Sequence, residues 1–218
     1  LYSNVPRIDF ETSVDWWEKH VLLKAVFPVN IRSPKATYEI QFGSIERATH
    51  ENTPFDRARF EVPHHRWMDL SEGNYGVAIA NDSKYGSDIL GNVMRLSLLR
   101  APVHPDPHAD EGRHEFVYSL IPHSGDWRHG SVVPLAAELN APMTIGMPKK
   151  SLGPLPSTNS WLETSSKNLM IETLKREEDG KRLVLRVYEC EGNRGVGTVL
   201  TRMPVKKAWA SNLVERNL

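Results

Sequence analysis

Cysteine is almost absent from this sequence, since Cys190 is the only one in 218 residues. A single thiol excludes an internal disulfide framework and a cysteine-rich zinc site. The chain also lacks net charge, because 27 Lys and Arg residues balance 27 Asp and Glu residues. It therefore has no long-range field that would select for DNA, RNA or an anionic membrane surface.

Long apolar runs are absent as well. None approaches the ~18 consecutive apolar residues of a membrane-spanning helix, and no signal peptide opens the chain. These absences predict a protein of the cytoplasm whose partners include neither a membrane nor a nucleic acid. The abrupt start at Leu1 favours a fragment of a longer polypeptide.

What the chain does contain is alternation of apolar and polar residues, which indicates strands. In the segment 37–42, the large apolar residues alternate with polar ones, so that Glu39 is expected to face outward. The apolar run 21–29 predicts a strand that is buried on both faces. The predicted strands are 21–29, 37–42, 60–63, 66–70, 75–80, 93–100, 114–122, 161–165, 169–175, 183–189, 196–203 and a short one within 208–218.

Helical spacing occurs only in the segment 130–140, where Val132, Val133, Ala136 and Leu139 fall on one face. About ten strands and at most one short helix predict an all-β fold, an antiparallel β-sandwich. The segment 142–160 is rich in proline and glycine and predicts a linker or crossing. We therefore expect a main sandwich over residues 1–141. Residues 142–218 either continue it or form a small second β-subdomain.

The most informative stretch runs from Asn81 to His123. Its turn combines an amide, a carboxylate, an ammonium and a phenol in Asn81, Asp82, Lys84 and Tyr85, although a turn needs only Gly with Asn or Asp. Two polar loops flank the strand 93–100 and are expected to project to the same end of a sheet. The second loop contributes Asp110 and Arg113, and all six side chains suit sugar hydroxyls.

The sequence here resembles a known family. The runs GVAIANDSKYGSDILGNVMRLSLLRAP (76–102), PDPHADEGRHEFVYSLIPH (105–123) and FPVNIRSPKATYEIQFGSIERATHENTPFDRARFEVPHHRWMDLSE (27–72) are similar to the C-terminal β-rich region of family-38 glycoside hydrolases, the α-mannosidases. The similarity is to the cytosolic, vacuolar and bacterial branch. It covers residues 27–123 almost without a break and is less distinctive beyond residue 142.

The resemblance carries implications for the fold, the site and the cofactor. It implies a supersandwich like that of galactose mutarotase, with the Asn81–Tyr85 turn and the Asp110–Arg113 turn at the rim of a mannose site. It implies a retaining α-mannosidase whose two carboxylates and zinc ion belong to an N-terminal catalytic domain that this chain lacks. The chain would then contain no catalytic or metal-binding residue. Its partners would be that domain, mannose-containing oligosaccharides and, as a further option, a second copy of itself.

Each of these features also has a simpler interpretation. The turn at Asn81 is equally explained as a hydrogen-bonded turn with an ion pair to Lys84, and Arg113 by pairing with Asp110 or Glu111. The loop histidines and acids could in principle bind zinc, but two prolines exclude the helical spacing of zinc proteases. His108-Ala109-Asp110 matches the bare His-x-Asp zinc pattern of the family, yet the residues that follow it do not.

Two other classes of function stay open at this point. A freestanding carbohydrate-binding module would bind mannose oligosaccharides through Tyr85 or the tryptophans. An interaction scaffold would bind no sugar, and its polar turn would serve architecture alone.

Overall fold

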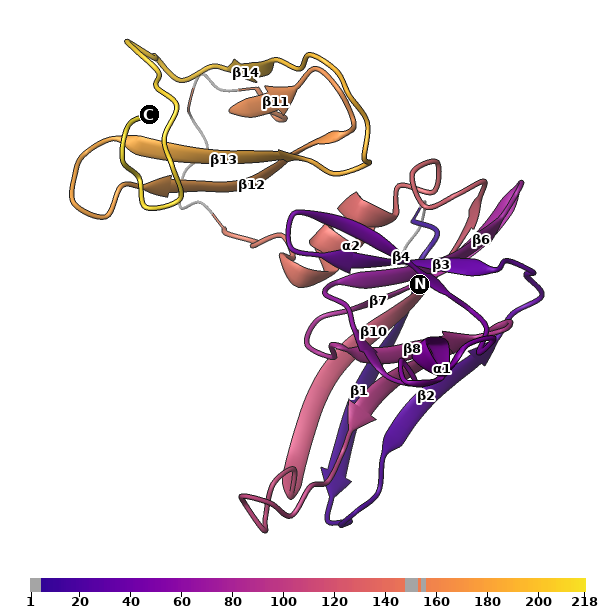
Figure 1. Ribbon diagram of the computed structural model, residues 1–218. Coiled ribbons are helices and arrows are strands. Elements are labelled where there is room, and N and C mark those ends of the chain that lie inside the picture. The colour runs from indigo at the N-terminus through magenta and orange to yellow at the C-terminus, as the bar shows by residue number, and fades with distance from the viewer. Residues whose placement is uncertain (1–4, 148–152, 154–155) are drawn as a thin grey trace. The chain divides into compact units, whose positions relative to one another are not determined.

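The computed structural model describes residues 5–147, 153 and 156–218, and the chain divides into two compact units, residues 1–144 and 145–218 (Figure 1). Every described strand pair is antiparallel. The predicted all-β antiparallel sandwich is confirmed. No helix in the described part of the chain is long and apolar enough to cross a membrane.

Two sheets build the first unit. The larger has the order β1 (Ile8–Trp16), β10 (Gly112–Ser124), β7 (Tyr75–Asn81), β6 (Trp67–Glu72), β3 (Lys35–Ile40), β4 (Gly43–Ala48). The smaller has the order β2 (Leu23–Pro28), β9 (Val93–Leu99), β8 (Gly86–Leu90), β5 (Val62–Pro63).

The main core lies between these sheets. Alternate residues of each strand point into it, so β9 buries Met94 and Leu96 completely, while β6 contributes Met68 and Leu70. Full burial of such a side chain stabilises the fold by about 1.5–3 kcal/mol. The alternation predicted for 93–100 and 114–122 is thus confirmed.

The opposite face of the larger sheet is also covered. The segment before α2 (Val132–Asn140) and the helix itself pack there, with Val132, Val133 and Ala136 buried against β6 and β7 (Figure 1). The helix begins two residues later than the predicted segment 130–140, and Pro134 is tolerated because it falls in the first turn. This second layer makes β6 and β7 strands with two buried faces.

Three strands of the first unit were not predicted, namely β1, β4 and β8. The expectation that 21–29 is buried on both faces is wrong, because β2 is an edge strand and Val26 is 52% exposed. The outward position of Glu39 is wrong as well. Glu39 is only 4% exposed, and its buried carboxylate accepts a hydrogen bond from Arg66 Nη2 at 2.7 Å.

A one-turn helix, α1 (Pro54–Arg57), forms where the sequence predicted only a polar loop. A capping box explains it, since Thr53 and Asp56 bond each other's backbone N–H groups and Pro54 stands at the first helical turn. The four residues of α1 are all at least partly exposed. Side-chain capping therefore holds this turn.

The second unit holds two small antiparallel pairs. The hairpin pairs β12 (Leu169–Arg176) with β13 (Leu183–Glu189), and β11 (Leu162–Thr164) pairs with β14 (Val199–Thr201). The predicted turn residues 179–180 lie in the connection 177–182 of this hairpin, but neither Asp179 nor Gly180 has the positive φ that a tight Asp-Gly turn requires. The last predicted strand is wrong, because 208–218 has only an isolated bridge between Ser211 and Asn217. Part of the predicted linker, residues 148–152 and 154–155, lies outside the described residues.

Candidate functional site: the polar corner between the sheets

The turn 81–86 and the loop 100–112 lie at the same end of the smaller sheet, but for a different reason from the one predicted. Loops that flank a single strand lie at its opposite ends. Here the hairpin of β8 and β9 stands between them, and it pairs Gly86 with Ser97. The start of β8 and the end of β9 are therefore neighbours, and the two loops meet at a polar corner.

This corner is where the chain crosses from one sheet to the other. The segment 81–86 leads from β7 to β8, and the segment 63–67 leads from β5 to β6. Backbone bonds join the two crossings, with His64 N donating to Tyr85 O at 3.0 Å and Asn81 N donating to Arg66 O at 2.9 Å. Hydrogen bonds between the two crossing segments thus hold both of them in place.

The Asn81 side chain fills the space between the crossings and has no exposed surface. Its Oδ1 accepts from the Lys84 N–H at 2.7 Å, while its Nδ2 donates to the His65 carbonyl at 2.9 Å. Because Lys84 N–H can only donate, the orientation of the amide is fixed, and Nδ2 faces His64 Nε2 at 3.0 Å. A side chain with no exposed surface cannot contact a ligand, so Asn81 serves as scaffold.

His64 must then be neutral. An Asn Nδ2 only donates, so His64 Nε2 accepts and the proton sits on Nδ1, which faces Ser87 Oγ at 2.8 Å. Burial lowers the pKa of His64 from 6.5 to about 3, and the charges of Arg47 and His65 add to this. The imidazole therefore joins the sheets as an uncharged bridge between Asn81 and Ser87.

We predict that this bridge weakens the first unit in acid. The unfolded chain binds the proton first, so the stability from His64 is complete above pH 6.5 and is lost as the pH falls toward 3. Between pH 6.5 and 4.5, the wild type should lose about 2 kcal/mol more than His64→Asn. Urea unfolding across this range measures the slopes. An equal loss of unfolding free energy in the wild type and His64→Asn would contradict the assignment. His104→Asn, at an exposed histidine, is the control and should show the wild-type loss.

Asp82 and Lys84 are half-buried at the same corner. Asp82 Oδ2 accepts from the Val117 N–H at 2.9 Å, which joins the turn to β10. The Lys84 ammonium lies 4.2 Å from the centroid of the Phe116 ring, and among the described residues it forms no ion pair. Burial lowers the pKa of Lys84, against the opposing charges of Asp110 and Asp82. The simple interpretation of an ion-paired Lys84 is thus wrong, although both carboxylates lie close enough to act on its charge.

Tyr85 is an exposed residue of the turn. Its side chain is 53% exposed, and its ring contacts His65 edge-on with centroids 6.2 Å apart. The phenol therefore has one side held by the crossing and one side open to solvent. It can donate and accept a hydrogen bond there.

Asp110 and Arg113 do not lie together as one unit. Asp110 Oδ2 accepts from the backbone N–H groups of Arg100 and Ala101, at 3.1 and 2.9 Å. Arg113 is exposed and pairs with Glu115, so the predicted pairing with Asp110 or Glu111 is wrong. It stands four residues before Val117 on β10, which is ~13 Å along a strand. The structure thus brings Asp82, Lys84 and Asp110 into electrostatic range and leaves Arg113 apart.

The loop histidines do not fit a metal centre. His108 Nδ1 faces Glu111 Oε2 at 2.8 Å, and His114 Nε2 faces the Asp110 carbonyl at 2.8 Å. Across residues 5–147, 153 and 156–218, no group of three or more His, Cys, Asp or Glu could hold a metal ion. His108 and His114 are therefore engaged in local contacts within this loop.

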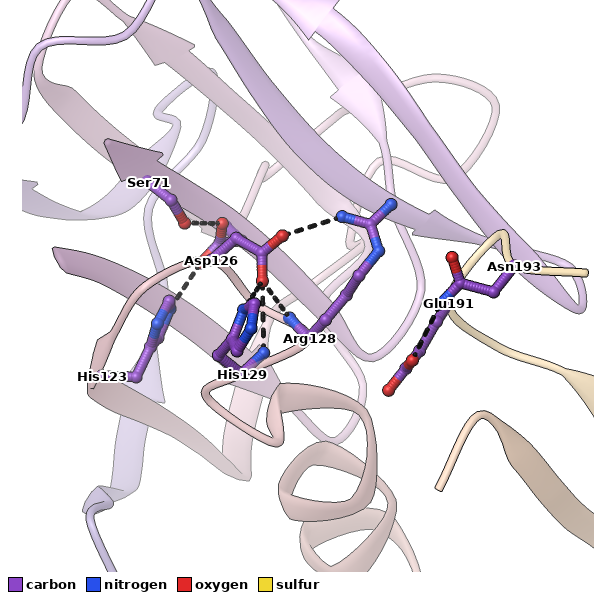
Figure 2. Close-up of polar contacts among 8 residues, drawn as sticks. Ser71, His123, Asp126, Arg128, His129, Glu191 and Asn193 are labelled. Atoms are coloured by element: carbon purple, nitrogen blue, oxygen red, sulfur yellow. Dashed lines mark hydrogen bonds and ion pairs between the residues drawn. The ribbon is translucent and has the colours of Figure 1, made fainter. Parts of the chain in front are cut away.

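A second polar cluster, which the sequence analysis did not predict, lies on the outer face of the larger sheet. Asp69 on β6 faces His123 on β10, with Asp69 Oδ2 and His123 Nε2 2.7 Å apart, and Ser71 donates to Asp69 Oδ1. Figure 2 marks the contacts of Ser71 and His123 by dashed lines. Burial raises the pKa of Asp69, against the bonds from His123 and Ser71. Only the spacing of polar residues within apolar strands could have indicated it.

This cluster is not built for nucleophilic catalysis. The Ser71 hydroxyl bonds the carboxylate rather than the imidazole, so the histidine is not placed to take its proton. Nearby, Asp126 is bonded by Arg128 Nη1 at 3.0 Å and faces His129 Nδ1 at 2.8 Å (Figure 2). These contacts fix the segment ahead of α2 over the buried pair. We interpret the cluster as structural.

Comparison with known proteins gives two family matches. The model of the "Glycosyl hydrolases family 38 C-terminal domain" matches residues 1–108, and that of the "Glycosyl hydrolases family 38 C-terminal beta sandwich domain" matches residues 168–218. Alpha-mannosidase 2C1 of Mus musculus is 46% identical over 97% of this chain and 20% of its own length. The alpha-mannosidase of Saccharomyces cerevisiae is 38% identical over 94% of this chain and 20% of its own length.

A solved structure shows a similar fold. An alpha-mannosidase from Enterococcus faecalis superimposes with a TM-score of 0.86 at 17% identity, over 100% of this chain and 26% of that chain. At this identity the likeness concerns the fold alone. The chain spans about a fifth of the length of the curated relatives it matches.

Proposed function

Since the chain belongs to the C-terminal region of glycosyl hydrolase family 38, we propose that it is the C-terminal portion of a retaining α-mannosidase. The complete enzyme would hydrolyse terminal α-mannosyl residues of oligosaccharides. One observation supports this above all: relatives named alpha-mannosidases match nearly the whole chain with only a fifth of their own length. The nucleophile, the acid/base and the zinc ion would belong to an N-terminal catalytic domain, and the enzyme would reside in the cytoplasm.

Within that enzyme, we assign this chain to buttressing the catalytic domain and to walling one side of its active site. Exposed aromatic side chains support a large protein partner, since Phe55 is 79% and Phe60 is 74% exposed. Adjacent exposed apolar side chains mark interaction surfaces. The catalytic domain is the occupant that we propose. Residues 142–218 would form a second β-subdomain of the same portion.

The polar corner would form the part of the active-site wall that contacts the sugar. Tyr85 offers a phenol to a sugar hydroxyl, and Lys84 offers an ammonium whose pKa partial burial already lowers. Asp82 and Asp110 would hold that ammonium in place and accept from hydroxyls on their open sides. Arg113 would act at a separate position along β10. Asn81 would hold the turn without meeting the sugar.

The purified 218-residue chain should fold and should not hydrolyse aryl α-mannosides. It carries none of the groups that form or break a glycosidic bond in this proposal, because retaining hydrolysis needs a nucleophile and an acid/base. The complete polypeptide from the same gene, assayed in parallel, should be active. Turnover by the isolated chain that persists with a chelator would contradict the proposal. A glycan titration of the isolated chain would reveal an independent sugar-binding module.

The corner residues are tested in the complete polypeptide. Lys84→Met and Tyr85→Phe should each lower kcat/KM for an α-mannoside by about tenfold, because each removes one polar contact to the sugar. Two matched controls should leave kcat/KM unchanged. Lys181→Met removes an ammonium from the exposed 178–181 turn, and Tyr75→Phe removes a phenol from the far end of β7. An equal loss of kcat/KM in the corner variants and in the control variants would show that the corner does not line the active site.

A further inference from the structure

A pocket of about 320 Å³ lies beside the α1 loop and is lined by residues of β3 and β4 in the larger sheet and of β8 in the smaller sheet. Its lining includes Tyr38, Arg47, Arg59 and Phe60. The volume falls at the lower end of the range of about 300–1,000 Å³ for small-molecule sites. The pocket is thus large enough for a compact ligand.

Arg47 is incompletely bonded at the base of this pocket. Its Nη1 is buried and has no hydrogen-bond partner among the described residues. Its guanidinium carbon lies 4.5 Å from the centroid of the buried Tyr38 ring, which holds the group in place. A buried donor without a partner is costly, so the geometry favours an acceptor that arrives from outside.

Arg59 places a second positive charge close to the first. Burial lowers the pKa of Arg47, and the charge of Arg59 lowers it further, against the effect of Tyr38. Arg59 itself forms no ion pair in the described part of the chain. Of the acids on this side, Asp56 is bonded by Thr53 at 2.8 Å in its capping box and lies 3.8 Å from His50, and Glu51 is exposed.

The other end of the pocket is already neutral. Lys24 Nζ bonds Asp88 at 2.6 Å and also pairs with Glu61, and Arg95 pairs with Asp88. Two cations there meet two carboxylates, so the two arginines of the lining that form no ion pair among the described residues are Arg47 and Arg59, although the Asp56 carboxylate acts on the charge of Arg59. An anion between these two would satisfy Nη1 and relieve their mutual repulsion.

We propose that the pocket under α1 is a binding site for a small molecule with an oxyanion group, a phosphate or a carboxylate, held by Arg47 and Arg59. Guanidinium groups bind both oxyanions through charge-assisted hydrogen bonds. Tyr38 and Phe60 supply the apolar wall for the rest of the molecule. The pocket shares no residue with the polar corner, but Phe60 also belongs to the surface that we assign to the catalytic domain.

Isothermal titration calorimetry of the 218-residue chain tests this site. Sodium phosphate and sodium acetate are titrated separately, at an ionic strength held constant with sodium chloride. Saturable binding is expected for at least one anion. Binding of phosphate alone would indicate a ligand with a phosphoryl group, and binding of acetate would indicate a ligand with a carboxylate group. Failure of both anions to bind the folded chain overturns the proposal.

Charge-matched variants locate the binding. Arg47→Gln and Arg59→Gln should each weaken the affinity by about tenfold or more, as expected for one charge-assisted hydrogen bond. Arg57→Gln removes the same charge from α1 without touching the pocket and should bind as the wild type does. Arg59 is exposed, so its variant tests the site even if Arg47→Gln unfolds. An equal loss with Arg57→Gln would show unspecific attraction and would overturn the site.

Discussion

Replacement of His123 by alanine should lower the free energy of unfolding of the first unit by about 3–5 kcal/mol. The Asp69 and His123 side chains are each only 2% exposed and lie 2.7 Å apart. Without the imidazole, the Asp69 carboxylate keeps the hydroxyl of Ser71 as its one side-chain hydrogen bond among the described residues. An uncompensated buried acid is among the most destabilising consequences of a single substitution.

A double variant separates this charge effect from the loss of packing. Asp69→Asn removes the charge and keeps the shape, so Asp69→Asn/His123→Ala should be more stable than His123→Ala alone. Urea unfolding, followed by tryptophan fluorescence, measures the free energy of unfolding of the wild type, the two single variants and the double variant. Trp67 and Trp127 report on this region because they lie on the same face of the sheet. A double variant that is no more stable than His123→Ala would show that the cavity, rather than the carboxylate, causes the loss.

The surroundings of the His123 side chain are tightly packed. A Cβ atom at Gly130 would lie 2.6 Å from His123 Cβ, and one at Gly76 would lie 2.3 Å from its Cε1. His123 is therefore packed between two backbone segments, from β7 and from the start of the α2 segment. The surroundings of Asp69 cannot easily collapse when the imidazole is removed, which places the expected loss toward the upper part of the range.

Replacement of Trp67 by alanine should cost a similar amount, about 3–5 kcal/mol. Trp67 is 1% exposed, and its ring centroid lies 4.9 Å from that of Trp127. Arg128 covers the other ring at 4.2 Å. Truncation would leave a cavity beneath the segment that leads to α2, and the two layers there would lose their largest contact.

Phenylalanine at the same position distinguishes packing from polarity. Trp67 Nε1 is buried and has no hydrogen-bond partner in the described part of the chain, so Trp67→Phe removes an unsatisfied donor and keeps most of the ring. Its cost should be about 1 kcal/mol. The measurement is again the midpoint and slope of urea unfolding. A loss from Trp67→Phe as large as that from Trp67→Ala would mean that the indole N–H has a partner in solution.

Much of the fold could be predicted from local pattern. The alternation in 93–100 and 114–122 identified β9 and most of β10, and the helical spacing near Val132 identified α2. Strands β1, β4 and β8 were not predicted because they are short or only partly buried, so their apolar residues are sparse. The family resemblance of residues 27–123 is confirmed by the comparisons, since it depends on sequence identity alone.

The candidate site was predictable only in part. The sequence identified the polar stretch, but it could not separate the scaffold residue Asn81 from the accessible Tyr85, because both are polar residues of one turn. It also missed Asp69 and His123, which are 54 residues apart in the chain. Their pairing depends on which strands become neighbours in the sheet.

The sequence by itself thus determined the class of fold, the positions of most strands and the family. Those properties follow from the two-residue period of a strand and from residue identity, both of which can be read along the chain. The tertiary structure decided which polar groups are buried and which remain open, at the polar corner and in the pocket at Arg47. Burial depends on strand order and on what covers each face, and the packing of distant segments sets both.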